Sequence, residues 1–343
     1  MDRRTVLGLM AGGAAALIPT GRPTHKPKPP KPTPTPTPVS VRQQGGTVII
    51  RPRTRTTAVA LMGWELTPAN VGLARLGIDG SSLPTYSGSK TPAQGTTISN
   101  MKITDTPIYC KNGNITIERC LIKPASHDVN GFGVICAKDT DDENAPNGFV
   151  IVRDCEIDGS LLADNQISNS CAIDGVFTAQ RNYTHDTGSG MAIQAWFNGP
   201  DQNALLESNY IVSNRNYLDS HSDGLTVRNY DVGSEFACNI RYNFVNCSSS
   251  SSTGALFFSV FSGKNMRNVT VTGNYALGNG YQCQLIQQDT SVYSNMRIIN
   301  NRVSDTDFGS GYVSGGVGWA EQSENYVYDA GQPDGKGAPV TFE

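Results

Sequence analysis

The chain has 343 residues, of which 38% are hydrophobic, so it can bury a core in one elongated domain or two compact ones. Its net charge of −3 conceals an uneven distribution: residues 1–55 contain ten Lys and Arg against one acid, whereas the remainder contains 17 basic and 29 acidic side chains. A domain with a net charge of −12 repels phosphate backbones and anionic lipids, so nucleic acid and membrane surfaces are excluded as its partners.

Residues 1–20 predict an export signal. Arg3 and Arg4 precede an apolar run from Val6 to Ile18 that is diluted with Gly and Ala. The run is shorter than the ~20 residues that span a bilayer, and paired arginines before it are typical of twin-arginine export. A buried N-terminal helix is the alternative, and no Ala-x-Ala motif marks a cleavage site. We expect a secreted or envelope-associated protein without membrane insertion beyond this segment.

Residues 21–42 predict a linker. In "GRPTHKPKPPKPTPTPTP" Pro alternates with Thr and Lys, and no apolar residue appears. Such a segment cannot form a core and adopts a semi-extended polyproline conformation. We therefore place the folded domain in residues 43–343.

Short alternating segments dominate the domain, and nine of them share one pattern: a strand, a polar step, an Asn or Cys, then a second strand. We call the Asn or Cys the anchor. The anchors are Asn100, Cys120, Cys155, Asn182, Asn209, Asn243, Asn274, Asn301 and Asn325. Their spacings are typical of solenoids. The pattern predicts an all-β fold, a single-stranded right-handed parallel β-helix of about nine coils, with an antiparallel β-sandwich as the alternative.

The anchors also predict a repeated corner. An Asn in the left-handed backbone region turns the chain between two sheets, and stacked Asn side chains can hydrogen-bond along the axis. Cys120 and Cys155 would fill the same buried slot with a small side chain. Every anchor is therefore expected to face inward or to lie at a coil corner.

Three stretches carry a resemblance to a known group: "LTPANVGL", "GTTISNMKITDTPIYCKNGNITIERCLIKP" and "DSHSDGLTVRN". In that order they resemble the secreted right-handed β-helix proteins of actinobacteria and their phages, within the broad pectate-lyase-like superfamily. The likeness covers roughly residues 64–330. It implies the β-helix fold, but lyases, hydrolases and non-enzymatic tail proteins share that architecture, so the reaction stays open.

The eight cysteines of an exported chain can form up to four disulfides. Cys136 follows Cys120 by 16 residues and Cys171 follows Cys155 by 16, which predicts matching slots in adjacent coils. Stacked free thiols and disulfides are equal alternatives there. Cys238 and Cys247 are the pair best suited to a disulfide, and no cysteine has zinc-ligand spacing.

The chemistry is predicted from histidines that stand beside acids ahead of a strand, in "SHDVNGFGV", "THDTGSGMAI" and "SHSDGLTV". Equivalent corners of adjacent coils lie side by side in a solenoid, so the second and third of these stretches are expected to line one groove. Turn residues that cap backbone amides are the alternative interpretation. The candidate catalytic residues are His221, Asp223, His185, Asp186, Asp174 and Arg228.

Two reactions could use these groups. Glycoside hydrolysis needs one carboxylic acid and a second carboxylate, whereas β-elimination needs a base and neutralisation of a uronate carboxylate. Elimination on this acidic domain would require Ca²⁺ as cofactor. The loop Asp139–Gly148 carries four acids, which could bind calcium or simply form a solvated insertion.

We therefore expect a secreted protein that acts on an extracellular polysaccharide, as a polysaccharide lyase or a glycoside hydrolase. The alternative is a non-enzymatic module that grips glycan, such as a phage tail component or a surface adhesin. Exposed aromatic side chains in a row along one sheet would favour binding, and two carboxylates with a base would favour catalysis. The sequence predicts neither the sugar nor an oligomeric state.

Overall fold

The computed structural model describes residues 60–127, 133–138, 148–168, 170–195, 202–217, 220, 222–249, 252–260, 263–286, 291–305, 311–314 and 318–342. The predicted export signal and linker lie outside these residues. All described residues belong to one contact-defined unit, Thr57–Glu343.

The described strands form three sheets, and every neighbouring pair is parallel except the last pair of the ten-stranded sheet. The nine-stranded sheet contains β1 (Thr97–Ser99), β4 (Ile115–Glu118), β7 (Val150–Arg153), β10 (Thr178–Gln180), β13 (Ala204–Glu207), β16 (Cys238–Arg241), β19 (Met266–Thr272), β22 (Tyr293–Ile299) and β25 (Glu321–Ser323). The ten-stranded sheet contains β2 (Lys102–Asp105), β5 (Leu121–Ser126), β8 (Glu156–Asp158), β11 (Tyr183–Thr187), β14 (Tyr210–Ser213), β17 (Phe244–Cys247), β20 (Tyr275–Gly278), β23 (Arg302–Val303), β26 (Tyr326–Tyr328) and β27 (Lys336–Pro339). The eight-stranded sheet contains β3 (Ile108–Tyr109), β6 (Gly133–Ala137), β9 (Cys171–Gly175), β12 (Ser189–Gln194), β15 (Ser222–Arg228), β18 (Ser252–Ser259), β21 (Tyr281–Ile286) and β24 (Gly311–Ser314).

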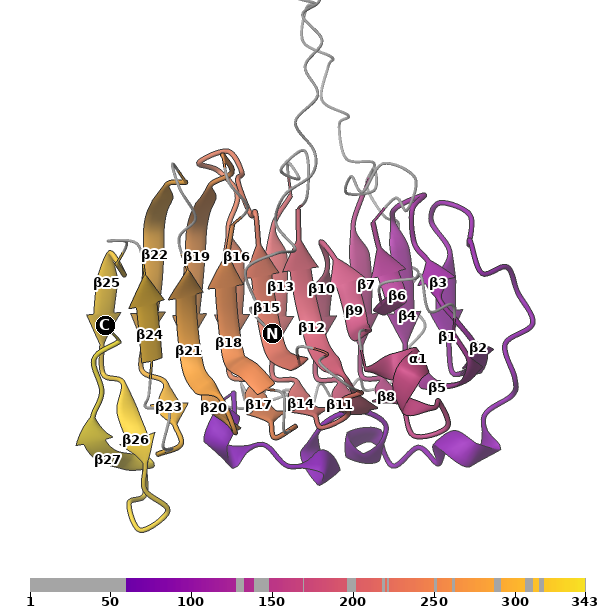
Figure 1. Ribbon diagram of the computed structural model, residues 1–343. Coiled ribbons are helices and arrows are strands. Elements are labelled where there is room, and N and C mark those ends of the chain that lie inside the picture. The colour runs from indigo at the N-terminus through magenta and orange to yellow at the C-terminus, as the bar shows by residue number, and fades with distance from the viewer. Residues whose placement is uncertain are drawn as a thin grey trace, which may run out of the picture. The chain divides into compact units, whose positions relative to one another are not determined.

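The chain visits the three sheets in turn, because neighbours within each sheet are mostly three strands apart in sequence order. Figure 1 shows the resulting series of strands, which lie side by side in chain order from β3 to β24. The predicted all-β fold of stacked parallel strands is confirmed at this level. Its core is a column of apolar side chains such as Ile117, Ile157 and Ile173, one from each sheet.

The anchors form a buried hydrogen-bonded ladder where the nine-stranded sheet turns into the ten-stranded sheet. Asn182 donates from both its backbone N–H and its side-chain Nδ2 to Oδ1 of Asn209 in the next coil, at 3.0 and 2.9 Å. Its Nδ2 also donates to the carbonyl of Val152 in the preceding coil (2.9 Å). The same bonds repeat through the successive anchors Asn209, Asn243, Asn274, Asn301 and Asn325. The predicted stacking of the Asn anchors is therefore confirmed.

Two details of the predicted corner are wrong. At every anchor except Asn100 the left-handed residue is the one before the anchor, so the anchor side chain is free to point inward. These residues are Asn100, Arg119, Asp154, Arg181, Ser208, Tyr242, Gly273, Asn300 and Glu324. Asn100 belongs to this set because Ser99 pairs with Glu118. In that register Met101, not Asn100, lies opposite Cys120 in the neighbouring coil. Asn100 is therefore exposed and outside the ladder.

Cysteines continue the ladder at its N-terminal end, but they form no disulfide. The backbone N–H of Cys155 donates to Asn182 Oδ1 (3.0 Å), and that of Cys120 donates to Cys155 Sγ (3.4 Å). All eight cysteines of the chain are described and free, so the predicted Cys238–Cys247 disulfide is absent. These two residues lie on different sheets, in β16 and β17. The expected matching slots in adjacent coils are confirmed for Cys120 and Cys155 but wrong for Cys136 and Cys171, since Cys136 pairs with Asp174.

An N-terminal segment crosses the coils before the first sheet strand. It contains four short 3-10 helices, η1 (Gly63–Glu65), η2 (Pro68–Asn70), η3 (Ala74–Leu76) and η4 (Gly80–Ser82). Its backbone bonds first to a late coil, Gly63 N–H to Gly273 O, and then to an earlier one, Gly72 N–H to Arg181 O. Figure 1 shows this segment in indigo, running along the coils. A Cβ at Gly72, whose φ is +55°, would lie 3.0 Å from a backbone oxygen, which explains the glycine in "LTPANVGL".

Candidate functional site

The predicted site residues lie on two different sheets. Asp174 lies on β9, and Asp223 and Arg228 lie on β15, all in the eight-stranded sheet, whereas His185 and Asp186 lie on β11 in the ten-stranded sheet. The two groups were expected to line one groove. The stretches around His185 and His221 are out of step, because Met191 pairs with Leu225, six residues after the first histidine and four after the second. His221 itself lies outside the described residues.

A buried ion pair occupies the outer face of the eight-stranded sheet. Asp174 alternates with the core residue Ile173, so its side chain points away from the core. Lys138, directly after β6, places Nζ 3.1 Å from Asp174 Oδ2, and each side chain is only 1% exposed. Removing either partner would strand a buried charge.

A second acid–base pair lies on the same face, on β15. Thr226 lies between the core residues Leu225 and Val227 and therefore points outward, and its Oγ1 donates to Asp223 Oδ2 (3.3 Å). Arg228 Nη2 lies 3.6 Å from the same carboxylate oxygen. The Asp223 side chain is 7% exposed and that of Arg228 is 29% exposed, so the guanidinium connects the pair with solvent.

The two pairs share one neighbourhood, which we call the acid–base cluster (Lys138, Asp174, Asp223 and Arg228). Burial raises the pKa of the Cys171 thiol, and so does Asp174, with smaller effects of the other three charged groups. One strand, β12, separates the pairs, and Asp174 pairs there with Ala192, which in turn pairs with Thr226. Two strand spacings put the two strands that carry these carboxylates about 9.6 Å apart.

The "SDG" of the third histidine stretch is not a turn. Ser222, Asp223 and Gly224 all lie within β15. A Cβ at Gly224 would lie 2.4 Å from Val245 Cγ1 and 2.5 Å from the carbonyl oxygen of Ala255. The glycine is therefore required by close packing inside the coil, and the turn interpretation is wrong for these residues.

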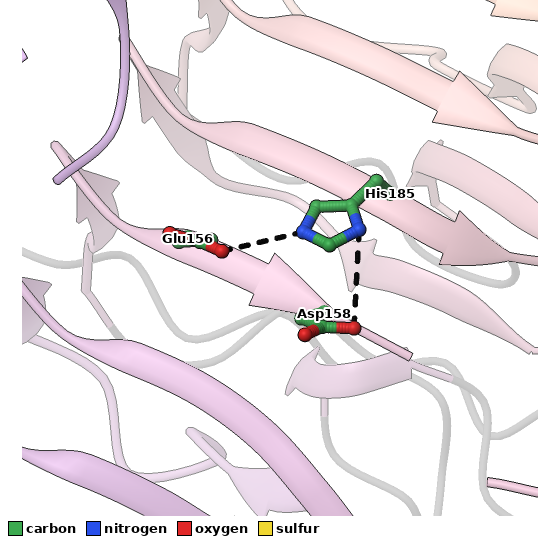
Figure 2. Close-up of side chains that lie close together, drawn as sticks. All are labelled: Glu156, Asp158 and His185. Carbon is green, nitrogen blue, oxygen red and sulfur yellow. Dashed lines mark hydrogen bonds and ion pairs between the residues drawn. The ribbon is translucent and has the colours of Figure 1, made fainter. Parts of the chain in front are cut away.

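A second cluster surrounds His185 on the ten-stranded sheet, and we call it the His185 cluster (Glu156, Asp158, His185 and Asp186). His185 Nδ1 lies 2.7 Å from Asp186 Oδ2 and 3.8 Å from Asp158 Oδ1, and its Nε2 lies 3.4 Å from Glu156 Oε1. Figure 2 shows the imidazole between Glu156 and Asp158, with one ring nitrogen toward each. One atom each from Glu156, Asp158 and His185 lie within 4.8 Å of one another, so these residues could hold a metal ion.

The local backbone builds this cluster. Glu156 and Asp158 project from the same face of β8, directly opposite Tyr183 and His185 of β11. His185 and Asp186 form a β-bulge, because Thr184 pairs with Ile211 but Thr187 pairs with Ser213. Asp186 has a φ of 54° and turns its carboxylate back toward the imidazole.

The cluster changes the titration of its members. Burial lowers the pKa of His185, but hydrogen bonds with Glu156 and Asp186 outweigh it and raise the pKa above the usual value. Burial raises the pKa of Asp158, but Lys123 and Ser160 outweigh it and lower the pKa below the usual value. Asp158 is therefore ionised at neutral pH.

Sequence reasoning missed Lys138, Glu156, Asp158 and Lys123. The anchors could have revealed two of them, because Glu156 and Asp158 follow anchor Cys155 by one and three residues, as Tyr183 and His185 follow Asn182. Lys138 gave no such signal, since its partner Asp174 lies a whole coil away.

The histidine of the first stretch has a structural role. His127 is buried, with Nδ1 3.2 Å from Thr106 Oγ1 and Nε2 3.1 Å from Ser170 Oγ. Its sequence neighbour Asp128 lies outside the described residues, and so does nearly all of the acidic loop Asp139–Gly148.

An aromatic row follows one register position of the ten-stranded sheet. Tyr183, Tyr210, Phe244 and Tyr275 pair in successive coils, and their rings contact one another at centroid distances of 5.7, 4.1 and 5.6 Å. The middle pair is stacked with an interplanar angle of 4°. The two outer contacts are edge-on, with interplanar angles of 71° and 80°, and all four rings are half-buried.

Among the described residues, no helix combines the length and apolar character needed to cross a membrane. No protein-family model, no curated protein and no solved structure matches the chain.

Proposed function

We propose that this chain is a secreted β-helix protein that cleaves glycosidic bonds of an extracellular polysaccharide at the acid–base cluster. The proposal rests on one observation: Asp174 and Asp223 lie on the same outer face of one sheet, two strands apart. Parallel strands repeated along an axis suit a polymer, because equivalent side chains recur at each coil.

The spacing of the strands that carry the two carboxylates is closer to the separation needed for inversion than to that needed for retention. Inverting glycosidases hold their two carboxyl groups ~6.5–9.5 Å apart to leave room for water, whereas retaining enzymes hold them ~5 Å apart. The strand spacing of about 9.6 Å slightly exceeds the first range and is about twice the second value. Asp174, 3.1 Å from Lys138, is assigned as the base because a nearby cation favours a charged carboxylate. Asp223 is assigned as the acid.

The elimination alternative would use Arg228 as the base. Its guanidinium is the most exposed charged group of the acid–base cluster. A polyuronate would approach two carboxylates there, so the alternative requires Ca²⁺. Each reaction leaves a different product, which makes the choice between them an experimental one.

The aromatic row is weak support for the binding alternative. Glycan-binding platforms present ring faces to the sugar, but in this row Tyr210 and Phe244 stack on each other at 4.1 Å and the neighbouring contacts are edge-on. The stacking contributes to stability between coils instead.

The test is incubation of the full chain with a panel of glycans, read by reducing-end release and by the absorbance of unsaturated uronates. We expect reducing ends without new absorbance on at least one polymer. Asp174→Asn should lower the rate by ~100-fold or more, whereas Asp231→Asn, a surface carboxylate paired with Arg267, should not. Absorbance that depends on added calcium would replace hydrolysis with elimination, and no product on any polymer would leave only the binding alternative.

The finer architecture belongs to the same proposal. We propose nine right-handed coils, since nine strands form one sheet and crossover connections between parallel strands are right-handed in about 98% of cases. We also propose that residues 1–20 direct export and that 21–42 form a spacer. Mass spectrometry of the secreted and cytoplasmic fractions of an expressing cell would test the export signal. An intact chain that retains residues 1–20 and is found only in the cytoplasm would contradict it.

A further inference from the structure

The His185 cluster carries more negative charge than its own cations neutralise. It contains three carboxylates, and Lys123 is the one lysine that contacts it among the described residues, with Nζ 2.7 Å from Asp158 Oδ2. With a neutral imidazole the group therefore has a formal charge of −2. The acid side chains are between 7% and 34% exposed, so bulk water screens this charge only in part.

The distances around Nδ1 suit a transition-metal ion. Two ligands of one tetrahedral zinc lie roughly 3.4 Å apart, given zinc–ligand distances of about 2.1 Å. Asp186 Oδ2 and Asp158 Oδ1 lie 2.7 and 3.8 Å from His185 Nδ1, on either side of that value. Both carboxylates contact the same ring nitrogen, so an ion bound at Nδ1 would have both of them beside it.

Neighbouring groups already orient each prospective ligand. The His185 ring stacks on Tyr183, with centroids 4.3 Å apart, which fixes its plane. Glu156 Oε1 lies 3.4 Å from Nε2 and can accept a hydrogen bond from it, which orients the ring. A metal ion would displace the proton that Nδ1 donates to Asp186.

The carboxylates are held in the same way. Asp158 Oδ1 accepts a hydrogen bond from the Ser160 N–H (2.8 Å), and Asp186 Oδ1 accepts one from Asn214 Nδ2 (3.4 Å). Carboxylate ligands that are themselves hydrogen-bonded are a regular feature of metal sites.

We propose that the His185 cluster binds a zinc-like divalent cation through His185 Nδ1, Asp158 Oδ1 and Asp186 Oδ2, with Glu156 as the residue that positions the imidazole. Figure 2 shows the imidazole between Asp158 and Glu156. An imidazole ligand favours zinc and other transition metals over calcium and magnesium, which prefer oxygen ligands only. The site lies on a different sheet from the acid–base cluster, so the proposal does not depend on the proposed function.

The test is isothermal titration of the metal-free full chain with Zn²⁺ in the presence of excess Ca²⁺. We expect one zinc per chain, lost in His185→Ala, and an affinity reduced 10–100-fold in Glu156→Gln. Lys123→Met should bind zinc more tightly than the unaltered chain, because the ammonium competes for Asp158. His25→Ala is the matched control for histidine removal and should bind as the unaltered chain does.

Equal zinc affinity in the unaltered chain and His185→Ala, or no zinc binding at all, would overturn the proposal. Circular dichroism of each variant confirms that its β-structure is retained. If His185→Ala does not fold, the other two variants decide the question. A purely structural imidazole predicts unchanged zinc affinity in both of them, whereas the proposal predicts a lower affinity in Glu156→Gln and a higher affinity in Lys123→Met.

Discussion

The corner that carries the anchors and the outer face of the eight-stranded sheet use polar side chains in opposite ways. At the corner one residue type repeats from Asn182 to Asn325, and each copy makes the same bonds. On the outer face every coil presents a different group, from Asp174 on β9 through Ala192 on β12 to Thr226 on β15. The regular repetition at the corner stabilises the stack. The outer face of the eight-stranded sheet lacks such repetition, so its side chains can differ from coil to coil and supply chemistry.

The ladder should give the largest loss of stability when it is interrupted. Asn243→Ala removes the acceptor of both Asn209 donors and the donor to the Leu206 carbonyl, all buried. Unsatisfied buried polar groups cost ~1–3 kcal/mol each, so the loss should reach ~4 kcal/mol. Thermal denaturation followed by circular dichroism measures it. Asn100→Gly, at an exposed left-handed position outside the ladder, is the control, and an equal loss there would contradict the comparison.

The buried ion pair of the outer face should give the next largest effect. Lys138→Met leaves the Asp174 carboxylate buried without its cation, which costs about 3 kcal/mol or more. The double variant Lys138→Met with Asp174→Leu should recover most of that loss, because no charge then remains buried. Urea denaturation of the three proteins checks the prediction, and a double variant as unstable as the single one would show that the pair is not coupled.

Packing inside the coil should give a smaller effect. Gly224→Ala places a methyl group 2.4 Å from Val245 Cγ1 and 2.5 Å from the Ala255 carbonyl oxygen. Such overpacking costs ~2 kcal/mol. Gly318→Ala is the control, since no atom lies within 4 Å of its added Cβ. Gly95 also has open space but has a positive φ, so an alanine there would be strained. Unchanged melting of Gly224→Ala would contradict the close packing assigned to this glycine.

The ion pairs on the nine-stranded sheet should give the smallest effect, visible as a pH dependence. Burial raises the pKa of Glu118, but Arg153 and Arg119 outweigh it and lower the pKa below 4.5. A depressed pKa stabilises the fold above about pH 4.5, and the contribution is lost as the pH falls through the lower folded-state value. Glu118→Gln should therefore lower the free energy of unfolding at pH 7 by less than ~1 kcal/mol and melt at a lower temperature than the unaltered chain. The difference should vanish near pH 3. A constant difference would assign the effect to packing.

The fold could be predicted from the sequence because the ladder repeats one residue type at one slot. The anchors from Cys120 onward occupy that slot, and the stretches around them form the strands. Asn100 was misplaced because Asn suits both the ladder slot and the left-handed position before it. The sequence pattern cannot separate these two uses.

The candidate site could be predicted only in part, because it depends on register between coils. Asp174, Asp223 and Arg228 do meet on one face, but His185 was assigned to the same groove because its stretch resembles that of His221. His185 lies on β11 of the ten-stranded sheet, and the pairing of Met191 with Leu225 puts the two histidine stretches two residues out of register. Lys138 has no local pattern, since its ion pair forms only when two coils stack.

The most direct test of the account compares Asp223→Asn with Asn243→Ala on any polymer that the unaltered chain cleaves. Asp223→Asn keeps the shape of the side chain and should reduce kcat about 100-fold or more with a small change of melting temperature. Asn243→Ala should do the reverse, with a large fall in melting temperature and an unchanged kcat at a temperature where it remains folded. Unchanged kcat in Asp223→Asn would contradict the assignment of chemistry to the outer face of the eight-stranded sheet.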